Sequence, residues 1–188
     1  MFNELNPHRG SLLLSEPFML DETFERSVIL LCEHDPKLQT VGLILNQNST
    51  FGLSDFIDDV ENKNIPLYIG GPVETVSVFF IHRAYDKIQS GTHLFEDLYW
   101  GGDYDRLFEL FNQNLLSPAE VKMFIGYCGW QAGQLDAEIK QNSWAVNNSF
   151  NVDLAFIQQG EQLWKEVLIN MGPKYAHVAN FPKRPEYN

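Results

Sequence analysis

The stretch Phe124–Trp144 constrains this chain most, because an apolar run there leads through three glycines into a helical pattern. Glycine permits φ > 0 and lets two backbones approach closely, so it is typical of a tight turn. Beyond the glycines, Leu135 and Ile139 stand at i and i+4, which predicts the apolar side of a helix that begins near Gln134. We therefore expect a strand, a three-glycine turn and a helix in direct succession.

Two interpretations of this segment stay open. The N-terminus of a helix exposes N–H groups that can bind a phosphate or a carboxylate. However, the segment has neither the Gly-Lys-Ser/Thr of a P-loop nor the Gly-x-Gly-x-x-Gly spacing of a dinucleotide site. The structural interpretation is favoured: the glycines permit the turn, Trp130 fills the core, and Gln134 or Glu138 satisfies nearby backbone groups. If a ligand binds here, we expect Gln134 and Glu138 to contact it.

The charge balance argues against direct contact with DNA. The chain has 25 Asp and Glu against 13 Lys and Arg, a formal net charge of -12 and a sequence pI near 4.7. Such a field repels phosphate backbones and anionic lipids. The hydrophobic fraction of 44% excludes a disordered chain, and 188 residues suit one compact domain. We expect a single domain over 1–188, with a core at about 10–172 and a loose tail at about 180–188.

The sequence predicts a cytoplasmic protein with no membrane association. The N-terminus lacks a cationic segment followed by an apolar stretch, so it does not resemble a secretory signal. The longest apolar runs, such as Val28–Cys32 and Val78–Ile81, are much too short for a membrane span. Cys32 and Cys128 both lie in apolar runs, which favours reduced core thiols over a disulfide.

Strand and helix patterns alternate along the chain, which predicts an α+β fold. β-branched and apolar runs predict the strands, and the second and third of these runs are expected to pair as a hairpin. Gly70-Gly71-Pro72 predicts a tight connection between the fourth and fifth. The expected strands are Ser11–Leu14, Ser27–Glu33, Val41–Asn46, Ile65–Ile69, Val76–His82 and Lys122–Tyr127.

Capping residues and helical spacing predict the helices. Ser54 can cap a short helix that ends near residue 60, and Asp103 can cap a longer one with an apolar stripe. The last helix is expected over Gln162–Met171 and is expected to stop at Gly172-Pro173.

Glu33-His34-Asp35 is a candidate for metal or acid–base chemistry. In a strand, His34 points away from Glu33 and Asp35, so one face does not easily gather all three side chains. At a strand end this restriction relaxes, and His82 can join from another strand. Because zinc needs three or four convergent ligands, buried and hydrogen-bonded histidines are the favoured interpretation, and no metal is assigned.

Cys128 with His34 or His82 as its base is the sharpest enzyme hypothesis, because a thiolate nucleophile needs an adjacent base or positive charge. Cys128 stands between aromatic neighbours, where a neutral thiol packs as a small hydrophobe. The second interpretation is favoured, and no catalytic residue is assigned.

A series of short sequence blocks covers most of the chain. The blocks are Gly10-Ser11-Leu12-Leu13 with Ser15, Pro17 and Asp21; Phe24 to Val28; Glu33-His34-Asp35; Gly42-Leu43-Ile44-Leu45-Asn46; Gly70-Gly71-Pro72-Val73; His82; and Gly129-Trp130 with Gly133-Gln134-Leu135, Glu138 and Trp144. In this order they resemble the AlgH/YqgE family, from about Gly10 to Gly172.

The resemblance implies a single domain with a mixed, partly barrel-like β-sheet surrounded by helices. It also implies a regulatory role, because the family is linked to bacterial alginate synthesis and transcription, and it supplies no established reaction, cofactor or catalytic residue. The chain departs from the family pattern at Cys128, where the family has alanine, at Ala132, where proline is common, and in the longer turn Pro36–Thr40. The first departure argues against a family-wide cysteine chemistry.

The resulting hypothesis is a cytoplasmic regulatory or interaction protein that acts through a protein partner or a small ligand rather than by direct nucleic-acid binding. The alternative is a small-ligand sensor or hydrolase-like enzyme with a glycine-turn pocket that includes His34 and His82. No cofactor is expected. The candidate ligand or partner site consists of Glu33, His34, Asn46, Gly70, Gly71, His82, Gly129, Trp130, Gln134 and Glu138.

Overall fold

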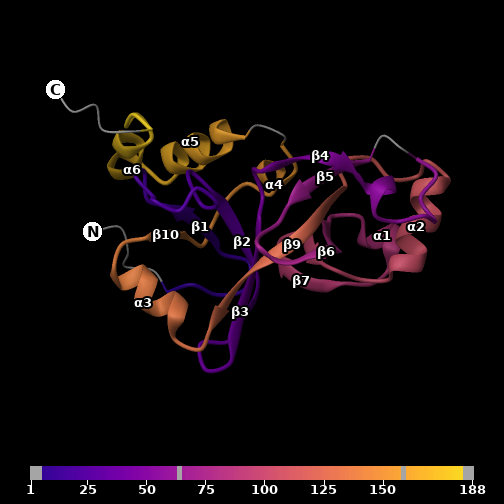
Figure 1. Cartoon of the computed structure of the whole chain (residues 1–188), viewed down its shortest axis with the longest axis horizontal. Helices are drawn as coiled ribbons and strands as arrows, with labels where there is room; N and C mark the ends of the chain where they lie inside the picture. Colours follow the sequence, from indigo (N-terminus) through magenta and orange to yellow (C-terminus); the bar gives the residue numbers. More distant parts are fainter. Residues whose placement is uncertain (1–5, 63–64, 158–159, 184–188) are drawn as a thin grey trace.

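The computed structural model describes residues 6–62, 65–157 and 160–183, in which one branched, ten-stranded sheet is surrounded by helices (Figure 1). Six strands correspond to predicted runs: β1 (Leu12–Ser15), β2 (Val28–His34), β3 (Gln39–Ile44), β5 (Pro66–Ile69), β6 (Val73–His82) and β9 (Val121–Gln131). β2 and β3 form the predicted antiparallel hairpin. Four strands were not predicted: β4 (Asn48–Gly52), β7 (Thr92–Phe95), β8 (Leu98–Trp100) and β10 (Trp144–Asn147).

The sheet is open and does not close into a barrel. The strand order is β10-β1-β2-β3-β9-β6-β8-β7, with β5 paired to β9 and β4 paired to β5. A barrel needs a continuous ring of pairing with a consistent stagger, whereas β10 and β7 lie at separate ends of this path among the described residues. The mixed α+β class with surrounding helices is confirmed, and the partly barrel-like sheet is corrected to an open one.

β9 joins the two parts of the sheet. Its first half pairs parallel with β5, where Leu67 lies opposite Met123, and antiparallel with β6. Its second half pairs antiparallel with β3, where Gly42 lies opposite Cys128. The expected three-glycine turn is therefore wrong in part. β9 continues through Gly129 and ends at Gln131, so only Gly133, with φ of 71°, lies in the turn before α3 (Gln134–Lys140).

Gly70 and Gly71 lie in the predicted tight connection between β5 and β6, where the backbone crosses close to β9. Among the described residues β5 and β6 do not pair with each other, and each pairs with β9. A Cβ at Gly70 would lie 2.3 Å from the Gly126 carbonyl oxygen, and one at Gly71 would lie 2.2 Å from the Tyr127 carbonyl carbon. Only glycine leaves room for two backbones at this separation.

Helices cover both faces of the β1–β2–β3 region, and Figure 1 shows α3 (Gln134–Lys140) on one side and α5 (Glu161–Asn170) with α6 (Pro173–Val178) on the other. Side chains alternate between the faces of a strand. Accordingly, Leu13 belongs to a buried cluster with Leu135 of α3, while Leu12 and Leu14 belong to another with Trp164 of α5.

The other end of the sheet packs against α1 (Tyr85–Ile88) and α2 (Tyr104–Asn112). As predicted, Asp103 caps α2: its Oδ1 accepts a hydrogen bond from the Arg106 N–H at 3.0 Å. Leu107 and Leu110 of α2 are buried in the same cluster as Phe80 of β6. The apolar stripe is therefore core.

One predicted helix is wrong in extent, and one predicted helix end is confirmed. The region after Ser54 forms only a 3₁₀ turn, η1 (Leu53–Asp55), in which Asp55 accepts a hydrogen bond from the Gly52 N–H at 2.8 Å. The helix predicted over Gln162–Met171 is α5, which ends before Gly172-Pro173 as expected. It is not the last helix, because α6 begins at Pro173, whose missing N–H needs no partner in the first turn of a helix. Within the described ranges no helix is long and apolar enough to cross a membrane.

Candidate functional site

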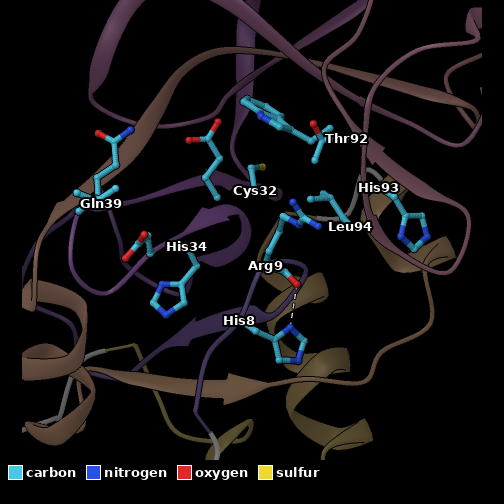
Figure 2. A pocket seen from close by; sticks show the side chains of 12 residues that line it. His8, Arg9, Cys32, His34, Gln39, Thr92, His93 and Leu94 are labelled. Atoms are coloured by element: carbon cyan, nitrogen blue, oxygen red, sulfur yellow. Dashed lines mark hydrogen bonds between the residues drawn. The ribbon is translucent and has the colours of Figure 1, made fainter.

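A hollow of about 620 Å³ carries two of the predicted site residues and is here called the histidine cavity. It is lined by residues 8–9, 32–35, 38–39 and 92–94 and by Trp100. Figure 2 shows His34 and Gln39 on one side, Thr92 and Leu94 on the other, and Cys32 between them. Glu33 and His34 are the two predicted site residues in this cavity.

Three separate segments build the histidine cavity. The pairing of β2 with β3 shifts register between Leu31 and Glu33, so that residues on both sides of the strand end reach the same hollow. The N-terminal segment is fixed beside β2 by the Gly10 N–H, which donates to the Leu31 carbonyl at 2.8 Å. β7 supplies the opposite wall.

Each of the three histidines in this cavity uses one ring nitrogen within the protein. His34 Nδ1 lies 2.7 Å from Thr40 Oγ1, His8 Nδ1 lies 2.8 Å from the Arg9 carbonyl oxygen, and His93 Nε2 lies 2.7 Å from the Glu96 carbonyl oxygen. Among the described residues the second ring nitrogen of each has no hydrogen-bond partner. The carbonyl contacts require His8 Nδ1 and His93 Nε2 to donate, whereas the Thr40 hydroxyl can either donate to His34 Nδ1 or accept from it. A second ring nitrogen that is available is suited to binding a polar ligand.

Charges of both signs line the same hollow. Arg9, Glu33 and Asp35 are exposed at its margin, and none of them forms an ion pair within the described part of the chain. Figure 2 shows Arg9 extending from the side of His8 toward Leu94. The lining thus offers a cation for an acidic group and carboxylates for a basic one.

The thiolate form of Cys32, which a nucleophile needs, is disfavoured in this cavity. Burial, together with the neighbouring Glu33 charge, raises the pKa of the Cys32 thiol well above its usual value, which keeps it protonated. No group of three or more His, Cys, Asp or Glu side chains in the described ranges is arranged to hold a metal ion.

His82 does not reach the histidine cavity. Its side chain is buried, its Nε2 lies 3.0 Å from the Ser90 carbonyl oxygen, and its ring stacks on Tyr99. Burial lowers the pKa of His82, although backbone contacts from Ser90 and Gly101 oppose this shift. The structure therefore separates His34 from His82, and the pairing of the two in one pocket has no support.

Four other predicted residues meet in a second hollow of about 400 Å³, here called the tryptophan cavity. Gly129 and Trp130 of β9 line it together with Gln134 and Glu138 of α3. Gln134 Oε1 accepts a hydrogen bond from the Gln131 N–H at 3.0 Å, so the expected backbone contact is confirmed for Gln134.

Glu138 makes side-chain contacts instead. Its Oε2 accepts hydrogen bonds from the indole N–H groups of Trp130 at 2.9 Å and Trp144 at 2.7 Å. Its Oε1 accepts one from Gln134 Nε2 at 2.9 Å. The carboxylate thereby joins β9, α3 and β10 in one polar network.

The remaining predicted residues have structural contacts. Asn46 Oδ1 accepts from the Val28 N–H at 2.9 Å, and its Nδ2 donates to the Arg26 carbonyl at 2.9 Å, which fixes the chain after β3. The Cys128 thiol donates to the Gly70 carbonyl at 3.3 Å. Burial raises the pKa of Cys128, so a thiolate is disfavoured there and a Cys128–His nucleophile has no support.

Comparison with known proteins places the chain in a family. The AlgH-like family model matches residues 12–176. The chain belongs to the AlgH-like family. A relative named UPF0301 protein from Chlorobium limicola is 36% identical over 187 residues, which cover 100% of this chain and 98% of the relative. Another UPF0301 protein, from Bacteroides thetaiotaomicron, is 36% identical over 189 residues, which cover 99% of this chain and 94% of the relative.

Two solved structures share the fold of this AlgH-like protein. The solution structure of the AlgH protein from Pseudomonas aeruginosa is 25% identical, has a TM-score of 0.73 and covers 96% of this chain and 98% of that one. The crystal structure of protein DIP2367 from Corynebacterium diphtheriae is also 25% identical, with a TM-score of 0.74 and 95% of each chain covered. The names of these relatives state no reaction, ligand or partner.

Several residues of this AlgH-like protein escaped the sequence analysis. His8, Arg9, His93 and Trp100 line the histidine cavity from loops and short strands that no motif connects. Lys122 is the first residue of an expected strand, yet it is 2% exposed, and its Nζ donates to the Leu45 carbonyl at 2.7 Å and the Ala155 carbonyl at 3.0 Å. Burial lowers the pKa of Lys122 to about 7.

Proposed function

We propose that this AlgH-like protein is a regulatory interaction protein whose contact with a protein partner depends on a small ligand in the histidine cavity. One observation carries the proposal. His8, His34 and His93 each use one ring nitrogen in a contact within the protein. They line the same hollow as Arg9 and Glu33, neither of which has an ion-pair partner in the described ranges. Polar groups that converge on a hollow without using their full hydrogen-bonding capacity are typical of ligand sites.

The charges of the cavity favour a zwitterionic ligand. A simple anion that pairs with Arg9 also meets the carboxylates of Glu33 and Asp35, and a simple cation that pairs with Glu33 meets Arg9. A small molecule that carries both an acidic and a basic group satisfies both signs. The volume of about 620 Å³ is sufficient for such a molecule with an aromatic body beside Trp100.

A protein partner suits this chain better than DNA. The net charge of -12 opposes a phosphate backbone. Leu38 lines the histidine cavity and is 72% exposed, so a protein that docks over the β2–β3 turn would bury an apolar side chain next to the bound ligand. Ligand and partner then share one contact region.

Nuclear magnetic resonance titration with three matched probes tests the ligand class. L-tryptophan carries both charges, tryptamine only the basic group, and indole-3-propionate only the acidic one. We expect L-tryptophan to shift the amide signals of residues 32–35 and 92–94 saturably and to bind roughly fivefold more tightly than either analogue, because it alone pairs with both charges. Equal responses to all three probes, or none, contradict the proposal.

Two variants separate the cavity from its surroundings. Arg9→Gln removes the cation that faces the ligand and is expected to abolish the preference for L-tryptophan over tryptamine. Lys37→Gln changes a charge in the turn between β2 and β3, outside the lining of the cavity, and is expected to leave the titration unchanged. The same loss in both variants would indicate a general electrostatic effect rather than a site.

Affinity capture under native conditions tests the partner. The wild-type protein is expected to retain a specific protein that His34→Ala loses, since His34 lies in the proposed contact region. Recovery of only non-specific background by the wild-type protein contradicts a stable partner.

A further inference from the structure

The tryptophan cavity has a different chemical character from the histidine cavity. Phe24, Trp130 and Trp144 line it as aromatic walls, and Asp21 and Glu138 are its acidic side chains. No described residue that lines it is Lys, Arg or His. The hollow of about 400 Å³ thus combines aromatic surface with negative charge alone.

The aromatic rings meet at nearly right angles. The Phe24 and Trp144 rings lie 5.6 Å apart at 82°, and the Trp130 and Trp144 rings lie 6.1 Å apart at 84°. Edge-to-face packing turns the ring faces in different directions, so the walls form a corner. The face of an aromatic ring is its negative region and attracts a cation.

The carboxylate of Glu138 adds to the negative potential of the aromatic walls. It accepts hydrogen bonds from three neutral donors, two indole N–H groups and one amide, and it forms no ion pair with Lys or Arg within the described ranges. Hydrogen bonding holds the carboxylate in place but leaves its charge uncompensated. Because each indole donates to an anion, its ring is polarised toward greater electron density on the face.

Asp21 adds a second carboxylate at the edge of the cavity. Its Oδ1 accepts a hydrogen bond from the Thr23 N–H at 2.9 Å, which fixes the turn that leads to Phe24. Asp21 likewise has no ion-pair partner among the described residues. The net charge of -12 for the whole chain also raises the local concentration of cations at its surface.

We infer that the tryptophan cavity is a second ligand site and that it takes a small organic ammonium ion. The cationic head lies between the aromatic corner and the two carboxylates, and the alkyl body lies against Met19 and Val73. This site is independent of the zwitterion proposed for the histidine cavity, because no lining residue is common to the two.

Choline and its neutral isostere 3,3-dimethylbutan-1-ol provide the test, because the two have the same shape and differ in charge. We expect choline to shift the indole N–H signals of Trp130 and Trp144 saturably and the isostere to bind at least roughly tenfold more weakly, since the difference is one desolvated cation–π contact and its carboxylate field. Equal binding of the two probes, or no saturable shift with choline, overturns the inference.

Variants then assign the contribution of each wall. Phe24→Leu keeps an apolar side chain but removes a ring face, so choline binding should weaken roughly fivefold while binding of the isostere stays unchanged. Asp21→Asn should weaken choline binding roughly threefold, and Asp136→Asn, which alters a residue of α3 outside the lining, should leave it unchanged. Unchanged choline affinity in both Phe24→Leu and Asp21→Asn contradicts the site.

Discussion

The histidine cavity and the tryptophan cavity differ in how their polar groups are used. In the histidine cavity, three imidazoles each hold one internal hydrogen bond and lie on exposed or half-buried segments. In the tryptophan cavity, Glu138 accepts three hydrogen bonds and joins β9, α3 and β10. The imidazoles of the histidine cavity each keep a ring nitrogen available to a ligand, whereas the Glu138 carboxylate of the tryptophan cavity is used in hydrogen bonds within the protein.

This difference separates stability from binding. Removal of a buried acceptor leaves its donors unsatisfied, whereas removal of an exposed side chain leaves little behind. Substitutions in the two cavities should therefore have opposite profiles.

Two glycines of β9 give the sharpest contrast. Gly126 has φ of 68°, and a Cβ there would lie 2.4 Å from the Gly71 carbonyl oxygen. Gly126→Ala is expected to lower the free energy of unfolding by about 4 kcal/mol. Gly129 lines the tryptophan cavity, and its nearest obstacle is a Tyr127 ring carbon at 3.3 Å, so Gly129→Ala is expected to lower it by less than about 1 kcal/mol. Urea denaturation measures the free energy of unfolding of both variants. Equal decreases in the two would contradict the close backbone crossing between Gly71 and Gly126.

Glu138 is the next largest test. Glu138→Ala leaves two largely buried indole N–H groups without their acceptor and should lower the free energy of unfolding by about 3 kcal/mol. Gln134→Ala removes one exposed amide from the same network and should lower it by about 1 kcal/mol. A smaller effect for Glu138→Ala than for Gln134→Ala would contradict the structural role assigned to the Glu138 carboxylate.

Lys122 extends the contrast to a buried cation. Burial lowers its pKa from 10.5 to about 7, so the unfolded chain binds more protons than the folded one between these values. The free energy of unfolding therefore rises with pH in this window, by roughly 1 to 2 kcal/mol from pH 7 to 8.5. Lys122→Met should lose this rise, as measured by urea denaturation at both pH values. A parallel pH dependence in wild type and variant contradicts the assignment to Lys122.

His34 is expected to show the reverse profile. His34→Ala removes one half-buried ring with a single internal hydrogen bond and should lower the free energy of unfolding by about 0.5 kcal/mol. The same substitution should weaken binding of L-tryptophan roughly tenfold, since it removes a polar group from the proposed contact. A large loss of stability with unchanged binding would reverse the roles of the two cavities.

Much of the fold could be predicted from local sequence patterns. The hairpin of β2 and β3 follows from two neighbouring β-branched and apolar runs, and the capped helix α2 follows from Asp103, because these signals lie within a few residues. The glycine segment was misjudged because a glycine can serve a turn or a close crossing, and only the partner backbone distinguishes the two. Gly126 lies against Gly71, far away in the sequence.

Predicted site residues lie in two separate cavities, and the sequence did not indicate this for a similar reason. Gln134 and Glu138 lie one helical turn apart, so their convergence on one hollow could be predicted. Glu33 and His34 were joined by His8, Arg9 and His93 from other segments, and no periodicity connects those segments. A cavity formed by loops depends on tertiary placement, which local patterns do not encode.

A single nuclear magnetic resonance sample titrated first with L-tryptophan and then with choline tests the central claim most directly. The claim is that the protein carries a zwitterion site in the histidine cavity, distinct from the aromatic site at α3. We predict that L-tryptophan shifts the signals of residues 32–35 and 92–94 saturably, and that choline then shifts the Trp130 and Trp144 indole signals without reversing the first set. Absence of saturable shifts around His34 with L-tryptophan, or displacement of one probe by the other, contradicts the account.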